Sequence, residues 1–115
     1  HIRRLIHAEL HRDVTDQQLL SVLPPTPAVG GVPRESALAF IRQHERHQRG
    51  WYAGVFGKIS YASSELAVTI RCAHIGPEII RLYAGAGIVA GSQPDEEWRE
   101  LDTKIADIMS LLGMG

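Results

Sequence analysis

Two glutamates and one lysine near the carboxyl end of the sequence have spacings that place them on one side of a helix. Glu97, Glu100 and Lys104 fall within a stripe about 60° wide when each residue turns the helix by roughly 100°. Two carboxylates one turn apart suit a hard cation such as Mg²⁺, which takes few carboxylates together with water and substrate oxygens. Lys104 would add a point charge for an anion. A solvated helix with a Glu100–Lys104 ion pair explains the same spacing, so these residues alone leave both interpretations open.

Two further features could complete a site for anions. Gly85-Ala86-Gly87 follows an apolar segment, where glycines let backbone N–H groups approach a ligand, although a tight turn is an equal explanation. Arg71 lies on the polar side of an alternating segment and would either bind a carboxylate bidentately or extend into solvent. Tyr52 and Tyr83 could donate hydroxyl groups, with core packing as the alternative. Together these residues predict a site for a small substrate with more than one carboxylate, one of them bridged by Mg²⁺.

The histidines and the cysteine give weaker signals. His7 and His11 lie four residues apart, but a zincin motif needs Glu directly after the first His, which is followed here by Ala8. A surface role is therefore favoured over a zinc site. Cys72 is the single cysteine and is expected to pack in the core. Because one cysteine cannot form an internal disulfide, we expect a cytoplasmic protein.

Composition limits the class of protein. The 115 residues are 44% hydrophobic and 22% charged, which is enough for one domain with a core. A net charge of -1 offers no basic surface for nucleic acid. No apolar run approaches the roughly 20 residues that cross a bilayer. The sequence starts with His1 instead of Met and has no signal-peptide pattern, so we expect a piece of a longer protein.

The hydrophobic pattern predicts helices in the first part of the chain. Ile2, Leu5, Ile6 and Leu10 predict an amphipathic helix over the first dozen residues. Thr15 to Gln18 has the form of a capping box and should start a second, short helix. Pro33 is expected as the first residue of a third helix, which should end near residues 46–48.

Strands are predicted in the middle of the chain, followed by a last helix. Residues 51–61, 65–73 and 79–84 have the composition or alternation of strands. In the second of these, alternate residues should face the core, and Arg71 should face the other way. Ser92 can cap the last helix, with Pro94 in its first turn. Its apolar stripe, expected to pack on the sheet, is Trp98, Leu101, Ile105, Ile108 and Leu112. The order predicts an α+β fragment with an antiparallel sheet and packed helices over residues 1–115.

Five ordered motifs resemble the carboxyl-terminal part of the chorismate-utilising enzymes. They are Pro25 to Gly31, Arg49 to Gly54, Val68 to Ala73, Arg81 to Val89, and Glu97 to Glu100 with Lys104. Within that family, Ile70-Arg71-Cys72-Ala73 and Glu97 to Leu101 are similar to the isochorismate synthase branch, especially its menaquinone-specific type. The resemblance therefore implies a fragment of a larger chorismate-binding fold, and an isomerase that converts chorismate to isochorismate for a menaquinone or siderophore pathway.

The resemblance also implies a role for each matching residue. Tyr52 and Arg71 would bind a substrate carboxylate, and the backbone N–H groups of Gly85 and Gly87 would cradle a carboxylate, with Lys104 nearby. Glu100 would be a Mg²⁺ ligand, and Glu97 would support the metal directly or through water. Many family members have His before the Pro-Thr pair, where this chain has Pro24. Any role of that position is therefore in doubt here.

No catalytic residue is expected within this segment. The lysine base and the glutamate acid of the family lie upstream, together with a further metal-binding glutamate, so the remainder of the catalytic domain is the implied partner. The 115-residue fragment alone should be inactive. Salicylate, anthranilate or aminodeoxychorismate synthesis on the same site is an alternative, and a non-catalytic structural domain is another.

Overall fold

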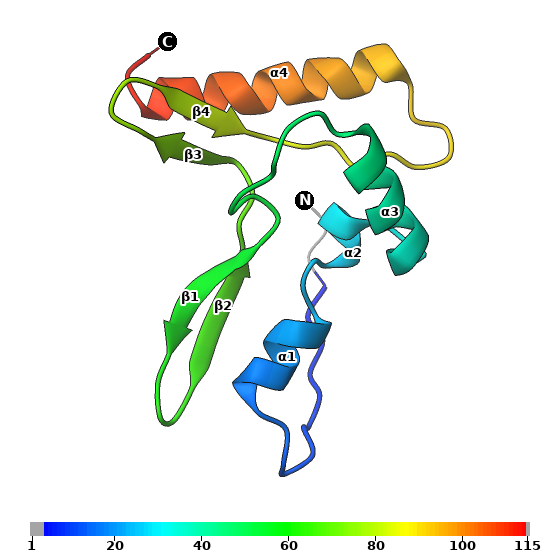
Figure 1. The fold of residues 1–115 in the computed structure, drawn as a ribbon, viewed down its shortest axis with the longest axis vertical. Coiled ribbons are helices and arrows are strands. Elements are labelled where there is room, and N and C mark those ends of the chain that lie inside the picture. The colour runs from blue at the N-terminus through cyan, green and yellow to red at the C-terminus, as the bar shows by residue number, and fades with distance from the viewer. Residues whose placement is uncertain (1–3, 115) are drawn as a thin grey trace.

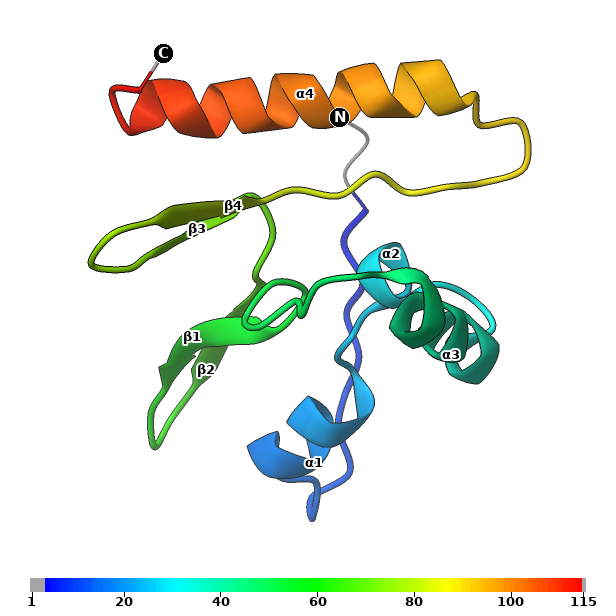
Figure 2. The same cartoon turned by 45° about the horizontal axis from the view of Figure 1, so that its top comes forward.

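The chain forms two antiparallel hairpins and four helices in a computed structural model that describes residues 4–114 (Figure 1). Strand β1 (Val55–Ile59) pairs with β2 (Ser64–Val68), and β3 (Cys72–Ile75) pairs with β4 (Ile80–Tyr83). The long helix α4 (Pro94–Leu111) runs alongside β3–β4, whereas β1–β2 projects away from it (Figures 1 and 2). The predicted α+β fold with antiparallel pairing and packed helices is confirmed.

Three short helices precede the hairpins. Helix α1 (Asp16–Val22) begins at Thr15, whose side chain and backbone exchange hydrogen bonds with Gln18, so the predicted capping box is confirmed. Helix α2 (Pro27–Gly30) follows the prolines. The guanidinium group of Arg34, at the start of α3 (Arg34–His44), donates hydrogen bonds to the carbonyls of Val22 and Pro24. These bonds hold the end of α1 against α3.

The predicted helix over the first dozen residues is wrong. Its first three residues, Ile2 among them, lie outside the described part of the chain, and residues 4–12 form no helix. Leu5, Ile6 and Leu10 are all more than half exposed. A short helix is marginal in water unless its apolar stripe is packed, and the described residues of this stripe remain mostly exposed.

Two predicted helix ends also differ. Pro33 is the N-cap of α3 rather than its first residue, and α3 ends at His44, two residues before the predicted range. Helix α4 is preceded by Gln93, and Ser92 does not cap it. The Ser92 hydroxyl instead accepts a hydrogen bond from the Val89 N–H at 3.1 Å, because the chain turns there before the helix begins.

The strand predicted over residues 65–73 is broken into two. Strand β2 ends at Val68 and β3 begins at Cys72, so the expected three strands are four strands in two separate sheets. Arg71 lies at the break with φ 49°, a left-handed conformation that costs energy for any residue with a Cβ. Alternation of polar and apolar residues could not predict the positive φ of Arg71, because it indicates which side each residue faces and not where the backbone breaks.

The core is much smaller than composition predicts. Among hydrophobic residues of the described chain only Ala53 and Ile108 are buried, and many large apolar side chains are exposed. Trp98 was expected on the packed face of α4 but is 67% exposed, and Leu112 is exposed as well. The hairpins and helices spread over 47 × 37 × 30 Å, so apolar content alone does not produce a closed core. No described helix has the length and apolar character needed to span a membrane.

Candidate functional site

A cleft of about 1080 Å³ lies between α4, the end of β4 and the loop before β1. Six of the seven predicted site residues line it: Tyr52, Arg71, Gly85, Gly87, Glu97 and Lys104. The seventh, Glu100, is not part of the lining but forms an ion pair with Lys104. The fold therefore brings together residues that are up to 52 positions apart in the sequence, from Tyr52 to Lys104.

The turn before β1 carries Tyr52 into this cleft. The Ala53 N–H donates to the Thr69 carbonyl at 2.8 Å, and the Thr69 N–H donates to the Gly54 carbonyl at 2.9 Å. These two bonds join the turn to the segment between β2 and β3, where Arg71 lies. Ala53 is buried and has φ 66°, so the turn is packed in a conformation that few side chains adopt.

Tyr52 and Gly85 are in close contact. A Cβ placed on Gly85 would lie 2.0 Å from the Tyr52 hydroxyl oxygen, whereas a Cβ on Gly87 would meet no atom within 4 Å. The Tyr52 ring is also stacked with Tyr83, with centroids 6.1 Å apart. Burial raises the pKa of Tyr52 above its ordinary value of 10.0, so the phenol is a neutral donor at physiological pH. A side chain at position 85 would therefore collide with the Tyr52 hydroxyl. The space beside Gly87, two residues further on, is open to a ligand.

Arg71 supplies an available guanidinium group. Its side chain is exposed along the cleft and makes no hydrogen bond or ion pair with any described residue. The backbone N–H groups of Gly85 and Gly87 likewise have no partner within residues 4–114. Unpaired donors of both kinds around one cleft can bind the oxygens of an anionic ligand.

Lys104 is more constrained than the sequence indicates. Its ammonium group donates to the Gly85 carbonyl at 2.8 Å and is paired with Glu100, and its side chain is only 18% exposed. Lys104 thus ties α4 to the glycine segment. On the same side of α4, Glu97 is half-buried along the cleft, while the Glu100 side chain is 53% exposed.

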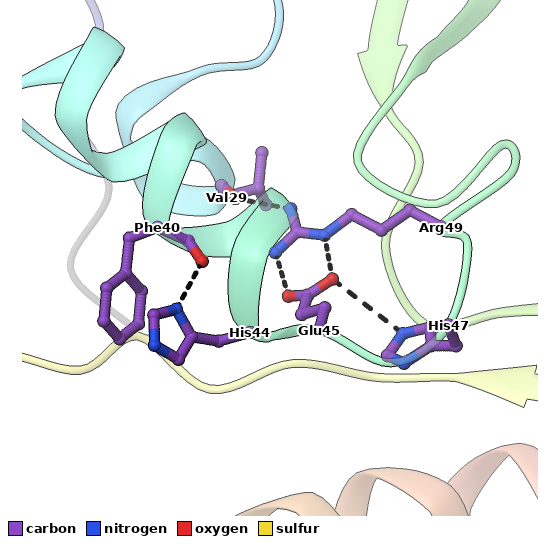
Figure 3. Close-up of polar contacts among 6 residues, drawn as sticks. All are labelled: Val29, Phe40, His44, Glu45, His47 and Arg49. Carbon is purple, nitrogen blue, oxygen red and sulfur yellow. Dashed lines mark hydrogen bonds and ion pairs between the residues drawn. The ribbon is translucent and has the colours of Figure 1, made fainter.

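Two residues that the sequence reasoning missed stand at the other wall of the cleft. Glu45 and Arg49 are joined by two hydrogen bonds, of 2.8 and 2.5 Å (Figure 3). The hydrogen bond from Arg49 lowers the pKa of Glu45, and the bond to Glu45 raises the pKa of Arg49, so both remain ionised. Their i,i+4 spacing was the available signal, but it lies beyond the end of α3, where helical spacing has no predictive value.

Cys72 begins β3 and is half-buried rather than part of a closed core. Burial raises the pKa of its thiol, which makes it a poor nucleophile. Among residues 4–114, no group of three or more His, Cys, Asp or Glu side chains is arranged to hold a metal ion. A cation in the cleft would therefore depend on the two carboxylates of α4 and on ligands from elsewhere.

Comparison with known proteins gives a consistent result. A family model described as "Chorismate binding enzyme" matches residues 1–113. The chain is 47% identical to "Isochorismate synthase MenF" of Escherichia coli (strain K12), over 99% of this chain and 26% of that protein. It is 42% identical to "Isochorismate synthase, chloroplastic" of Catharanthus roseus, over 97% of this chain and 20% of that protein.

A third relative carries a different qualifier in its name. The "Salicylate biosynthesis isochorismate synthase" of Pseudomonas aeruginosa is 40% identical, over 97% of this chain and 24% of that protein. The chain thus spans about a quarter of the length of the curated relatives it matches. No solved structure matches it. Because the family model matches residues 1–113 and the alignments with relatives cover 97–99% of this chain, the chain belongs to the chorismate-binding enzyme family.

Proposed function

We propose that the full-length protein carrying this chain is a cytoplasmic isochorismate synthase, which isomerises chorismate to isochorismate with Mg²⁺ in a menaquinone or siderophore pathway. The observation that carries this proposal is the convergence of Tyr52, Arg71 and residues 85–87 on one cleft. The names of the relatives supply the substrate class. Chorismate carries two carboxylates, and the cleft offers donors at several points around its wall.

Each donor has a defined task in this proposal. The unpaired guanidinium of Arg71 binds one carboxylate bidentately, and the Tyr52 hydroxyl donates to the same group. The N–H groups of Gly85 and Gly87 bind a carboxylate oxygen. Lys104 adds positive charge and, by holding the Gly85 carbonyl, keeps the N–H groups of the glycine segment in place. The left-handed backbone of Arg71 supports its role, because strained residues persist where the surrounding structure determines them and cluster at binding sites.

The two carboxylates of α4 fit a magnesium ion. Glu97 and Glu100 are one turn apart, and Mg²⁺ is commonly held by one or two carboxylates together with water and substrate oxygens. When bound there, the ion would neutralise a substrate carboxylate and polarise it. Glu97, which lines the cleft, and Glu100, which is paired with Lys104, are the residues that would hold the ion.

This chain supplies binding groups and not the proton-transfer groups. Its two lysines are Lys58, exposed on β1 outside the cleft, and Lys104, which is held by Gly85 and Glu100. Neither is placed to act as a general base on a ligand in the cleft. We therefore infer that the base comes from the part of the full-length protein outside this chain, where the family resemblance also puts the acid.

Product analysis of the full-length protein tests the reaction. Purified protein incubated with chorismate and MgCl₂ should yield isochorismate by liquid chromatography, and the yield should vanish when the metal is chelated. Salicylate with pyruvate as the main product would contradict the proposal in favour of salicylate synthesis. Anthranilate or aminodeoxychorismate, formed when an ammonia source is added, would contradict it in the same way.

The metal role has its own variant. Glu100→Gln in the full-length protein should reduce Mg²⁺-dependent turnover by roughly 100-fold, because the substitution removes a charged ligand while keeping the shape. Glu96→Gln, an exposed carboxylate in the first turn of the same helix, serves as the matched control. Undiminished turnover in Glu100→Gln would favour a purely structural role for the carboxylates of α4.

A further inference from the structure

Arg49 lies on the same cleft as Arg71 but is engaged differently. Its Nε and one terminal nitrogen donate to the two carboxylate oxygens of Glu45, and its other terminal nitrogen donates to the Val29 carbonyl at 2.8 Å (Figure 3). All three guanidinium nitrogens are therefore occupied by the protein itself. Arg71 has no such partner among the described residues. The guanidinium group of Arg71 is thus free to bind a ligand, whereas that of Arg49 is already bound by the protein.

The bound arginine contacts Tyr52. The central carbon of its guanidinium group lies 5.6 Å from the centre of the Tyr52 ring, within the range of a cation–π contact. The Tyr52 N–H also donates to the Arg49 carbonyl at 2.9 Å. Arg49 therefore contacts both the ring and the backbone of the tyrosine whose hydroxyl lies against Gly85.

The partners of Arg49 come from separate elements. Val29 belongs to α2 and Glu45 directly follows α3, so the guanidinium connects both helices to the turn that carries Tyr52. His47, 3.9 Å from Glu45, is largely exposed and adds little to this network. A planar group with several donors can make such a junction, whereas a lysine ammonium cannot reproduce its geometry.

We propose that Arg49, held by Glu45 and the Val29 carbonyl, is a positioning residue that fixes the Tyr52 ring so that its hydroxyl faces the substrate-binding cleft beside Gly85. This inference rests on the proposed function for the identity of the ligand, a dicarboxylate. It assigns Arg49 no contact with that ligand. Its effect passes through Tyr52 alone, and the size of the effect is limited by what the Tyr52 hydroxyl contributes.

A double-mutant cycle in the full-length protein tests the inference. Tyr52→Phe and Arg49→Lys should each raise the KM for chorismate by about 10-fold with kcat within about twofold, the loss expected for one hydrogen bond to a charged group. The double variant should also show an increase of about 10-fold. Once Phe replaces Tyr52, no hydroxyl remains whose position the change at Arg49 could affect. Arg46→Lys, an exposed arginine on the same segment, is the matched control and should keep the wild-type KM.

A structural role would give a different pattern. If Arg49 acted on binding independently of Tyr52, the effects on KM would multiply to about 100-fold. If Arg49 only stabilised the fold, Arg49→Lys would lower the melting temperature and leave KM unchanged. Either result overturns the inference. If Arg49→Lys does not fold, Glu45→Gln takes its place in the same cycle. Glu45→Gln keeps the shape of the side chain and weakens its hydrogen bonds with Arg49, so it should raise KM by about threefold. Combined with Tyr52→Phe, it should give the same KM as Tyr52→Phe alone.

A second measurement separates this inference from the proposed function. With 3-fluorotyrosine at position 52, the ¹⁹F resonance should shift or broaden in Arg49→Lys and stay unchanged in Arg46→Lys. This readout needs no turnover. A protein that makes no isochorismate but shows the shift would contradict the proposed function and retain the positioning role, while an unchanged resonance would overturn the positioning role itself.

Discussion

Hairpins β1–β2 and β3–β4 are similar in length and pairing but differ in their helix contacts. Within residues 4–114, α4 runs alongside β3–β4, whereas the Ser64 hydroxyl at the start of β2 only donates a hydrogen bond to the Asp16 carboxylate of α1 at 2.8 Å. Ile108 of α4 is 7% exposed, and the side chains of Cys72 and Tyr83 on the covered hairpin are half-buried. Ile59 on the other hairpin is 55% exposed. A two-stranded hairpin is marginal in water until a further layer packs on it. The difference explains why the candidate site is built around β3–β4.

The cleft lies where the covered hairpin meets the turn before β1. Arg71 directly precedes β3 and Gly85 comes shortly after β4, so the two ends of this hairpin supply two of the proposed binding groups. Lys104 then joins α4 to Gly85. The hairpin that has a helix over it thus has fixed ends, and fixed ends are what a binding site needs.

The largest effect should come from the buried contact of α4. Ile108→Ala in the full-length protein should lower the free energy of unfolding by about 2–5 kcal/mol, because it leaves a cavity at the buried position of α4. Urea denaturation measures the loss. Ile59→Ala on β1 should cost less than about 1 kcal/mol as long as β1–β2 stays exposed. Equal losses of stability in Ile108→Ala and Ile59→Ala would contradict the difference between the two hairpins. Residues outside this chain would then have to cover β1–β2.

Two glycines sharpen the comparison. A Cβ on Gly85 would lie 2.0 Å from the Tyr52 hydroxyl, whereas one on Gly57 of β1 would lie 2.1 Å from the backbone carbonyl oxygen of Glu65. Gly85→Ala should therefore displace a side chain and reduce kcat/KM for chorismate by about 10- to 100-fold with little loss of stability. Gly57→Ala should disturb strand pairing and lower stability instead. Steady-state kinetics and thermal unfolding of both variants measure the two effects, and a stability loss in Gly85→Ala equal to that in Gly57→Ala would contradict the assignment.

The smallest expected effect is on the stability of the protein at acidic pH. The bond from Arg49 holds the pKa of Glu45 below its ordinary 4.5, so at a pH between the two values the unfolded chain binds a proton that the folded chain does not. The stabilisation is present above pH 4.5 and is lost as the pH falls through the lowered pKa. Because the pair is partly exposed, it amounts to less than about 1 kcal/mol.

Glu45→Gln in the full-length protein should accordingly flatten the fall in stability below pH 4.5. Glu65→Gln on the exposed hairpin, whose side chain has no ion pair among the described residues, is the control and should leave the acid slope unchanged. Unfolding in urea at several pH values measures both. Identical slopes in Glu45→Gln and the wild type would show that the Glu45–Arg49 pair contributes nothing measurable.

Local chemistry accounts for the parts of the fold that the sequence predicted. The capping box of Thr15 and Gln18 and the start of α4 beside Pro94 depend on groups a few residues apart. The same holds for the turn between β3 and β4. The helix predicted at the amino end is wrong because apolar spacing gives a stable helix only where its stripe is packed, and Leu5 and Leu10 remain more than half exposed. The prediction of one strand through Arg71 is wrong because the alternation of polar and apolar residues does not indicate the sign of φ.

The sequence by itself determined which residue types are available: the Glu97–Glu100–Lys104 stripe, the Gly85–Gly87 segment, Arg71, and the motifs that place the chain in its family. Only the tertiary structure decided how they are used. Whether a guanidinium group is open or bound depends on partners from other elements, as Arg71 and Arg49 show. Likewise Lys104 is held by Gly85, 19 positions away. Such contacts follow from packing in three dimensions, which spacing along the chain does not encode.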